Sequence, residues 1–203
     1  PLRLPLSCPA WHEPLLQALP YAQRLELERR EPEARRASLA GLGLVLVGAA
    51  RMSQREFPPQ AFTFPPAGKP RLAGGPYFSI SHSNSAVSCI VCADTDCGID
   101  IEDRPDPAES ATVAKLQRWT ATEAALKAAG LGLRASGEVA LADLLGHAIV
   151  RSQCYELQSL DDMPGVIGHI AARKKLTPTI AFLELDDART SALLERSLGL
   201  AAQ

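Results

Sequence analysis

The 203-residue sequence lacks any marked excess of one charge, with 21 Lys and Arg against 23 Asp and Glu. The chain therefore has no basic surplus that would indicate nucleic-acid binding, and it has no acidic run that would indicate a charged tail. The longest apolar run, residues 39–50, contains three glycines and is too short to span a bilayer. The first residues carry no charged start followed by an apolar secretory segment. These absences lead us to expect a cytoplasmic globular protein without a membrane or nucleic-acid partner.

Cysteine is scarce and odd in number, because the chain has five, which does not suit a framework of paired disulfides. Cys89 and Cys92 form a C-x-x-C pattern, but they lie in an apolar, strand-like run where positions three apart face opposite sides. No second cysteine pair and no suitably spaced histidine completes a zinc site. We therefore expect buried, reduced thiols.

Hydrophobic residues make up 46% of the chain, which is enough for one large domain or two small ones with a sizeable core. Helix and strand signals occur in both halves and predict an α+β fold. We expect short helices within 13–30 that break at Pro20, and helices at 33–52, 111–118, 119–130, 141–147 and 188–200. We expect strands at 2–6, 77–81, 86–93, 97–102, 149–159, 165–172 and 178–185.

Two of these helices carry further signals. The glycines within 33–52 lower helix propensity, so we interpret them as sites of close packing. Thr120 and Glu123 have the spacing of an N-terminal capping box, and Gly130 is a C-terminal stop. An apolar helix and several strands in each half fit a duplicated unit, although no sequence repeat is visible.

A pair of acidic side chains lies in the strand expected at 97–102. Because side chains alternate across a strand, Ile99 and Ile101 enter a core while Asp100 and Glu102 project together from the other face. Two carboxylates one pleat apart repel each other unless a cation or hydrogen-bond donors neutralise them. Magnesium is a hard cation that takes such oxygen ligands.

Glu123 and Lys127 are one helical turn apart and share a face of the helix expected at 119–130. Taken alone, they are a common surface pair, and Glu123 is a capping-box residue. Combined with Asp100 and Glu102, Glu123 completes a set of three carboxylates for magnesium that leaves room for phosphate oxygens. Lys127 then lies within reach of the same phosphates.

Other polar groups have two interpretations each. His82, at a strand end, is either a turn histidine or a hydrogen-bond donor to phosphate. Lys69, in a Gly-Lys-Pro turn, is by itself no more than an exposed lysine. An early basic group forms either an ion-paired, solvated face or an anion site: Arg29, Arg30, Arg35 and Arg36. A later basic group faces either solvent or an acidic protein partner: Arg104, Lys115 and Arg118.

Four stretches together resemble the 4′-phosphopantetheinyl transferases of the surfactin-synthetase-activating type. They are AGKPRL at 67–72, FSISHS at 78–83, GIDIE at 98–102 and WTATEAALKAAGLGL at 119–133, and their order and spacing match. The resemblance covers roughly residues 30–175. It implies a pseudo-twofold monomer of two similar α+β subdomains, 1–95 and 96–203. Coenzyme A would bind in the cleft between them, and the metal-site carboxylates would belong to the second.

The resemblance also implies roles for individual residues. The three magnesium ligands it implies are Asp100, Glu102 and Glu123. The residues it places at coenzyme A are Lys69, Ser81, His82 and Lys127, with the histidine near the 3′-phosphate. Two positions depart from the family pattern, because Thr122 replaces a lysine and Leu42 replaces an arginine. Arg30, Arg35 and Arg36 are candidates to supply the missing phosphate contacts.

The activity implied is transfer of the 4′-phosphopantetheine group from coenzyme A to a serine of an acyl or peptidyl carrier protein, with release of 3′,5′-ADP. Magnesium, Lys127 and His82 would offset the charge of the leaving group. Glu123 would take the serine proton, directly or through a metal-bound water. Two alternatives stay open: another magnesium-dependent nucleotide phosphohydrolase, and a non-catalytic module that binds a carrier protein. The sequence does not distinguish carriers of fatty-acid, polyketide and nonribosomal-peptide synthesis.

Overall fold

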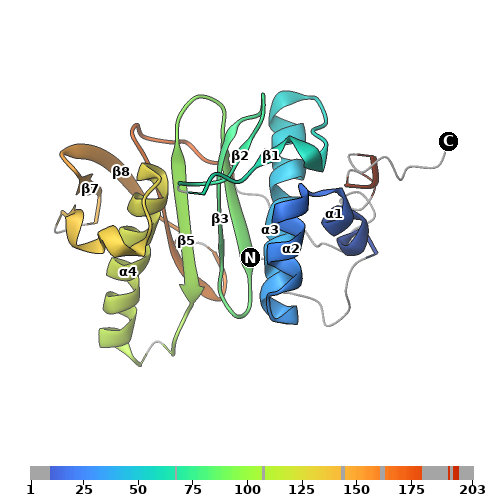
Figure 1. The fold of residues 1–203 in the computed structure, drawn as a ribbon. Helices are drawn as coiled ribbons and strands as arrows, with labels where there is room; N and C mark the ends of the chain where they lie inside the picture. The colour runs from blue at the N-terminus through green and yellow to red at the C-terminus, as the bar shows by residue number, and fades with distance from the viewer. Residues whose placement is uncertain are drawn as a thin grey trace.

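The computed structural model describes residues 10–66, 68–106, 108–142, 145–160, 163–179, 192 and 194–196. The expected α+β class is confirmed, since helices and antiparallel strands are mixed along the chain (Figure 1). The strand expected at 2–6, and most of the strand at 178–185 and the helix at 188–200, lie outside the described residues. Within the described part, no helix combines the length and apolar composition needed to cross a membrane.

Three helices open the described chain: α1 (His12–Ala18), α2 (Tyr21–Glu28) and α3 (Pro32–Ser53). Pro20 separates the first two, as the sequence predicts. Pro32 occupies the first turn of α3, where the missing N–H has no intrahelical partner to lose. α3 extends the helix expected at 33–52 by one residue at each end.

The glycines of α3 permit close packing against the strands that follow, as predicted. A Cβ atom on Gly41 would lie 2.5 Å from Cγ2 of Ile80, and one on Gly48 would lie 2.8 Å from Cγ2 of Val91. Both distances are shorter than real Cβ contacts, so only glycine fits without a shift. The helix can therefore approach the strands at these two points.

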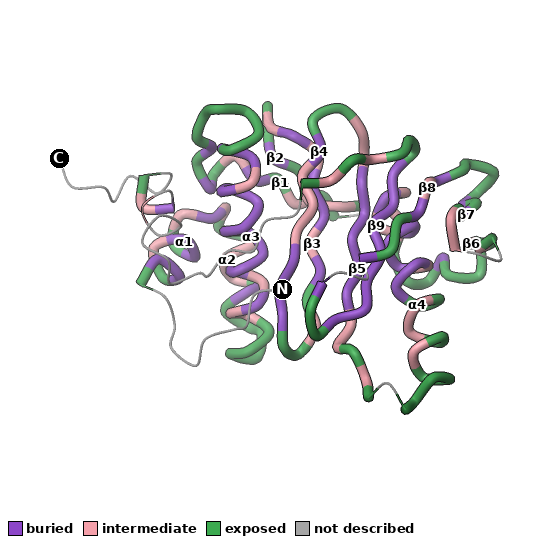
Figure 2. The backbone as a smooth tube through the Cα atoms, turned by 180° about the vertical axis from the view of Figure 1, so that it is seen from behind, coloured by how far each residue is buried: buried purple, intermediate pink, exposed green. Residues whose placement is uncertain are grey.

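After a 3₁₀ turn (Pro59–Ala61), the chain forms two small antiparallel sheets, β1 (Phe62–Thr63) with β2 (Arg71–Leu72), and β3 (Tyr77–His82) with β4 (Val87–Cys92). The strands expected at 77–81 and 86–93 are confirmed within one residue. α1, α3, β3 and β4 enclose the first hydrophobic core, into which Leu194 also packs. Figure 2 shows buried stretches of backbone along α3, β3 and β4, which contribute to this core.

The second half contains one long helix and a curled five-stranded antiparallel sheet. Its elements are β5 (Cys97–Asp103), α4 (Ser110–Ala129), a 3₁₀ turn (Leu133–Glu138), β6 (Val139–Leu141), β7 (His147–Val150), β8 (Gln153–Ser159) and β9 (Val166–Ala172). The strand order is β5-β9-β8-β7-β6. α4 packs against β5 and β9, and its first half extends into solvent (Figures 1 and 2).

Three predictions for this half are wrong in detail. The helices expected at 111–118 and 119–130 are one continuous helix, so Thr120 is not an N-cap; its hydroxyl donates to backbone carbonyls of the preceding turn. The described residues of the helix expected at 141–147 are not helical, because β6 ends at 141 and β7 begins at 147. The strand expected at 149–159 is a hairpin that turns at Arg151 and Ser152, both with positive φ. Gly130 does end α4, in a left-handed conformation.

The two halves meet where β3 lies alongside β5. Hydroxyl groups of β3 replace a backbone ladder here: the Ile99 N–H donates to Ser79 Oγ at 3.2 Å, and the Ile101 N–H donates to Ser81 Oγ at 3.2 Å. The register runs in the same direction on both strands, so they are parallel. The domain boundary placed between residues 95 and 96 stays a prediction.

Candidate functional site

The acidic strand β5 presents its two faces to different surroundings, as alternation requires. Ile99 and Ile101 enter a hydrophobic cluster, while Asp100 lies on the face that α4 covers. Gly98 makes this contact possible, because a Cβ atom there would overlap the carbonyl oxygen of Ala124. The helix therefore runs directly over the strand and brings its own polar residues to the carboxylates.

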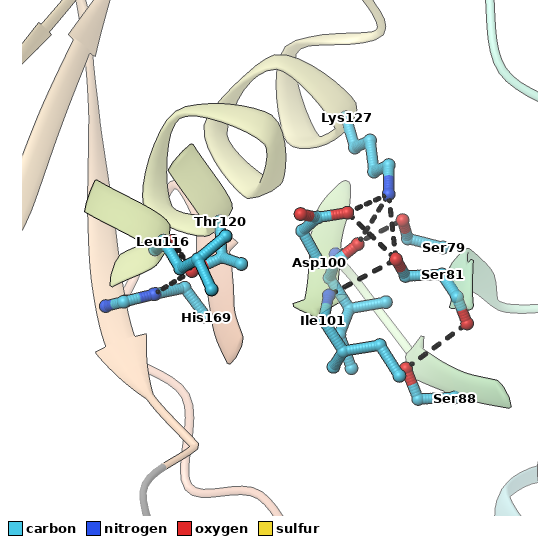
Figure 3. A network of polar contacts seen from close by, with 10 residues as sticks. Ser79, Ser81, Ser88, Asp100, Ile101, Leu116, Thr120, Lys127 and His169 are labelled. Carbon is cyan, nitrogen blue, oxygen red and sulfur yellow. Dashed lines mark hydrogen bonds and ion pairs between the residues drawn. The ribbon is translucent and has the colours of Figure 1, made fainter. Parts of the chain in front are cut away.

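Lys127 of α4 is the centre of a buried polar network (Figure 3). Its ammonium group donates to Asp100 Oδ1 at 2.6 Å, to the Ile99 carbonyl oxygen at 3.2 Å and to Ser81 Oγ at 3.2 Å. The Ser81 hydroxyl in turn donates to the same Asp100 oxygen at 2.8 Å. Asp100 is only 5% exposed and Lys127 is partly buried, so this pair is a charge-assisted hydrogen bond with limited access to solvent.

The other two predicted metal ligands lie in the electrostatic field of Asp100. Burial, and then the Asp100 carboxylate, raise the pKa of Glu123, and Lys127 opposes them. The same two causes raise the pKa of Glu102, and a hydrogen bond from the exposed Trp119 opposes them. Asp100, Glu102 and Glu123 thus form a negative cluster, in which the Asp100 carboxylate raises the pKa of the other two acids and Lys127 opposes that shift.

Two oxygen atoms in this cluster have no hydrogen-bond partner. They are Asp100 Oδ2 and Glu123 Oε1, and both are buried. A buried, unpaired carboxylate oxygen is costly and calls for an explanation such as an ion. As the side chains stand, however, the described residues contain no group of three His, Cys, Asp or Glu side chains arranged to hold a metal.

A cavity of about 360 Å³ adjoins the network at Lys127. Its walls come from the turn at 68–70, from residues 78–80 of β3, and from the loop at 130–132 that follows α4. The cavity thus lies between the two halves of the chain. A smaller hollow of about 180 Å³ shares Lys69, Pro70 and Phe78 with it.

Lys69 provides the second ammonium group of this cavity. Its Nζ donates to the Cys97 carbonyl oxygen at 2.6 Å and lies 3.5 Å from Asp96. Burial lowers the pKa of Lys69, while Cys97 and Asp96 oppose that shift. The structure therefore brings together Lys69 and Lys127, which the sequence analysis singled out separately, on one cavity.

Three further predicted residues lie away from the cavity walls. His82 is exposed at the end of β3, opposite Val87. Arg30 pairs with Glu26 and donates to Ser38 Oγ between α2 and α3. Arg36 lies near His12, whose pKa is lowered to about 4 by burial and by the arginine charge. The site described here thus includes neither arginine.

The sequence analysis missed a buried pair beneath the site. His169 of β9 lies directly opposite Asp100 in the strand register, and its Nδ1 is 2.8 Å from Thr120 Oγ1 of α4. Both residues are at most 2% exposed. The available signal was a lone histidine in the apolar run at 166–172. This pair links α4 to β9 one helical turn before Glu123.

The cysteines only partly follow the expectation of buried thiols. Cys92 and Cys97 are buried and share a hydrogen bond between their thiols, whereas Cys154 is exposed. Cys89 packs against the first core and makes no pair with Cys92. Cys89 and Cys92 therefore have different surroundings, as expected of strand positions three apart.

Comparison with known proteins does not identify the chain. No protein-family model matches it, and no curated protein matches it significantly. The family resemblance therefore rests on the four motifs alone. Three of them, at 67–72, 78–83 and 119–133, contribute walls of the cavity, and the fourth contributes Asp100 beside it.

Proposed function

We propose that this protein is a 4′-phosphopantetheinyl transferase that modifies a serine of an acyl or peptidyl carrier protein with coenzyme A as donor. One observation carries the proposal: two buried carboxylate oxygens without partners, on Asp100 and Glu123, lie beside Lys127 at the edge of a 360 Å³ cavity. A cavity with cationic walls suits phosphate groups, and an unsatisfied acidic cluster next to it suits a divalent cation.

The donor set fits magnesium. Asp100, Glu102 and Glu123 offer only oxygen atoms, which hard cations prefer. A cation would give a partner to the buried oxygens Asp100 Oδ2 and Glu123 Oε1, which have none. When bound, magnesium would neutralise charge on the diphosphate and on the departing nucleotide. We propose these three residues as the ligands, with adjustment of their side chains on binding.

The chain's own residues account for the rest of the proposed reaction. Lys69 and Lys127, which both line the cavity, would bind the phosphates. His82 lies outside the cavity walls, at the exposed end of β3, and would contact the 3′-phosphate of the bound ligand from there. Glu123, whose pKa is raised, would accept the proton of the carrier serine. Both lysines also counter the charge that develops on 3′,5′-ADP as it leaves.

The arrangement of the halves supports the proposed fold of two similar subdomains. α3 packs on the β3-β4 pair, and α4 packs on β5 and β9, so each half has a long helix against antiparallel strands. The cavity takes its walls from residues 68–70 and 78–80 of one half and from Lys127 and residues 130–132 of the other. We propose that coenzyme A binds at this junction and that the single chain suffices to form the site.

The test is intact-protein mass spectrometry of apo-carriers incubated with coenzyme A and magnesium. The expected result is a mass gain of one phosphopantetheine on a carrier serine, and no gain with Asp100→Asn or Glu123→Gln. Glu138→Gln is the matched control, because Glu138 pairs with Arg151 on the surface. Full transfer by a folded Asp100→Asn or Glu123→Gln variant would refute the site.

The same assay separates the alternatives. A phosphohydrolase would release phosphate or phosphopantetheine without changing the mass of any carrier. A binding module would retain a carrier but add no mass. A panel of carriers from fatty-acid, polyketide and nonribosomal-peptide synthesis would identify the protein partner.

A further inference from the structure

Lys127 belongs to two parts of the site at once. Its ammonium group is bound within the acidic cluster by Asp100, Ser81 and the Ile99 carbonyl, and its side chain also lines the cavity. A lysine side chain has four rotatable carbons, so the ammonium can move several ångströms without a change in the backbone. The two positions, at the carboxylate and in the cavity, are therefore both within its reach.

In the acidic cluster the Lys127 ammonium neutralises part of the carboxylate charge, as a bound metal ion would. It neutralises Asp100 at 2.6 Å, and it lowers the pKa of both Glu102 and Glu123 against the effects of burial and of Asp100. A divalent cation that binds the same carboxylates would approach this ammonium closely and be repelled by it. The lysine and the cation therefore compete for Asp100 Oδ1.

We propose that Lys127 is an exchangeable counter-ion: it holds Asp100 while the cation is absent and turns into the cavity, towards the phosphates of the ligand, when the cation binds. The inference rests on the proposed function. Its consequence is that the cation and the phosphate ligand bind with positive coupling, because each favours the second position of Lys127. Before the cation binds, the ion pair of Lys127 with Asp100 also avoids the cost of a buried carboxylate without a counter-charge.

The first experiment measures Mn²⁺ affinity without any nucleotide, by electron paramagnetic resonance of free Mn²⁺. Lys127→Met should bind Mn²⁺ about tenfold more tightly than the wild type, since a charge-assisted hydrogen bond no longer has to be broken. Lys127→Arg should bind no more tightly than the wild type. Lys174→Met is the control for net charge, because Lys174 pairs with Asp94 on the surface, and it should leave the affinity unchanged.

The second experiment uses the wild-type protein and is independent of how the variants fold. Brief acetylation, read by peptide mass spectrometry, reports how accessible each lysine amine is. Mg²⁺ alone should increase the modification of Lys127 several-fold, while Lys115, Lys174 and Lys175 serve as internal references. Unchanged modification of Lys127 at saturating Mg²⁺ would overturn the exchange.

The outcomes distinguish this inference from the proposed function. If the wild type binds Mn²⁺ and modifies a carrier, but a folded Lys127→Met variant binds the ion no more tightly, the exchange is wrong and the function stands. If neither protein binds Mn²⁺ at millimolar concentration, the metal site fails, and the proposed function and the exchange fail with it.

Discussion

Gly98→Ala tests whether α4 lies directly on β5, on which the geometry of the candidate site depends. The added Cβ would overlap the Ala124 carbonyl oxygen and lie 2.6 Å from the Ala128 backbone nitrogen. Both obstacles are backbone atoms of the helix, so the helix itself would have to move. Overpacking of a core typically costs 1–3 kcal/mol, and rigid backbone places this change at the upper end, at about 3 kcal/mol.

The assay is urea denaturation of Gly98→Ala beside the wild type and Gly137→Ala. A Cβ on Gly137 meets nothing within 4 Å, so that variant should change the free energy of unfolding by no more than about 0.5 kcal/mol. Because a shift of α4 also carries Glu123 and Lys127 away from Asp100, carrier labelling by Gly98→Ala should fall as well. Equal stability of the two variants would refute the packing of α4 on β5.

Two further predictions concern buried polar groups. The pKa of His12 is lowered from 6.5 to about 4 in the folded protein, so the unfolded chain binds more protons between these values. The neutral His12 side chain therefore contributes about 3 kcal/mol to the free energy of unfolding above pH 6.5, and this contribution is lost as the pH falls towards 4. His12→Gln should reduce the pH dependence of the free energy of unfolding between pH 6.5 and 4, measured by urea denaturation. An unchanged pH dependence would contradict the assignment. Thr120→Val removes the Thr120 partner of His169 Nδ1 and should cost about 1–3 kcal/mol in the same assay. Thr120→Ser should restore most of the loss, and a neutral Thr120→Val would show that the pair does not stabilise α4.

Local signals predicted several features in both halves of the chain. Pro20 separates α1 from α2 because proline ends or starts a helix by its own geometry. The alternation at 97–102 predicted that Ile99 and Ile101 enter a core and that Asp100 projects from the other face, which α4 covers in the structure. Gly130 was identified as the end of α4 because a left-handed residue suits glycine. In each case the residues that determine the local structure lie within a few positions of it in the sequence.

Predictions failed where a local pattern has two structural uses. Thr120 and Glu123 have capping-box spacing, but the same threonine inside a helix bonds back to the Leu116 carbonyl. The turn at Arg151 and Ser152 has no glycine or asparagine, so nothing in the sequence indicated that these residues adopt positive φ. Tertiary pairing of β7 with β8 overrides local preference there.

The candidate site was predictable as a set of residues but not as an arrangement. Asp100, Glu123 and Lys127 follow from spacing on a strand and a helix. That Lys127 binds Asp100, rather than only facing Glu123, depends on the packing of α4 on β5 through Gly98. The early arginines were candidates only by charge, and the position of α2 and α3 places Arg30 with Glu26 instead.

The serines of β3 connect the architecture to the site, and a matched pair of variants measures that connection. Ser79 and Ser81 are equally buried, and each accepts a β5 amide at 3.2 Å. Ser81 also donates to Asp100 and accepts from Lys127, so its hydroxyl uses its donor and both acceptor sites.

Replacement of either serine by alanine leaves one buried N–H unpaired, but only Ser81→Ala also removes two bonds to charged groups. Ser79→Ala should therefore lower the free energy of unfolding by about 1–3 kcal/mol, and Ser81→Ala by about 1.5 kcal/mol more. Urea denaturation of both variants at neutral pH measures the difference. Equal losses would mean that the hydrogen bonds of Ser81 to Asp100 and Lys127 add no stability. The contact between β3 and β5 and the acidic cluster would then be energetically independent.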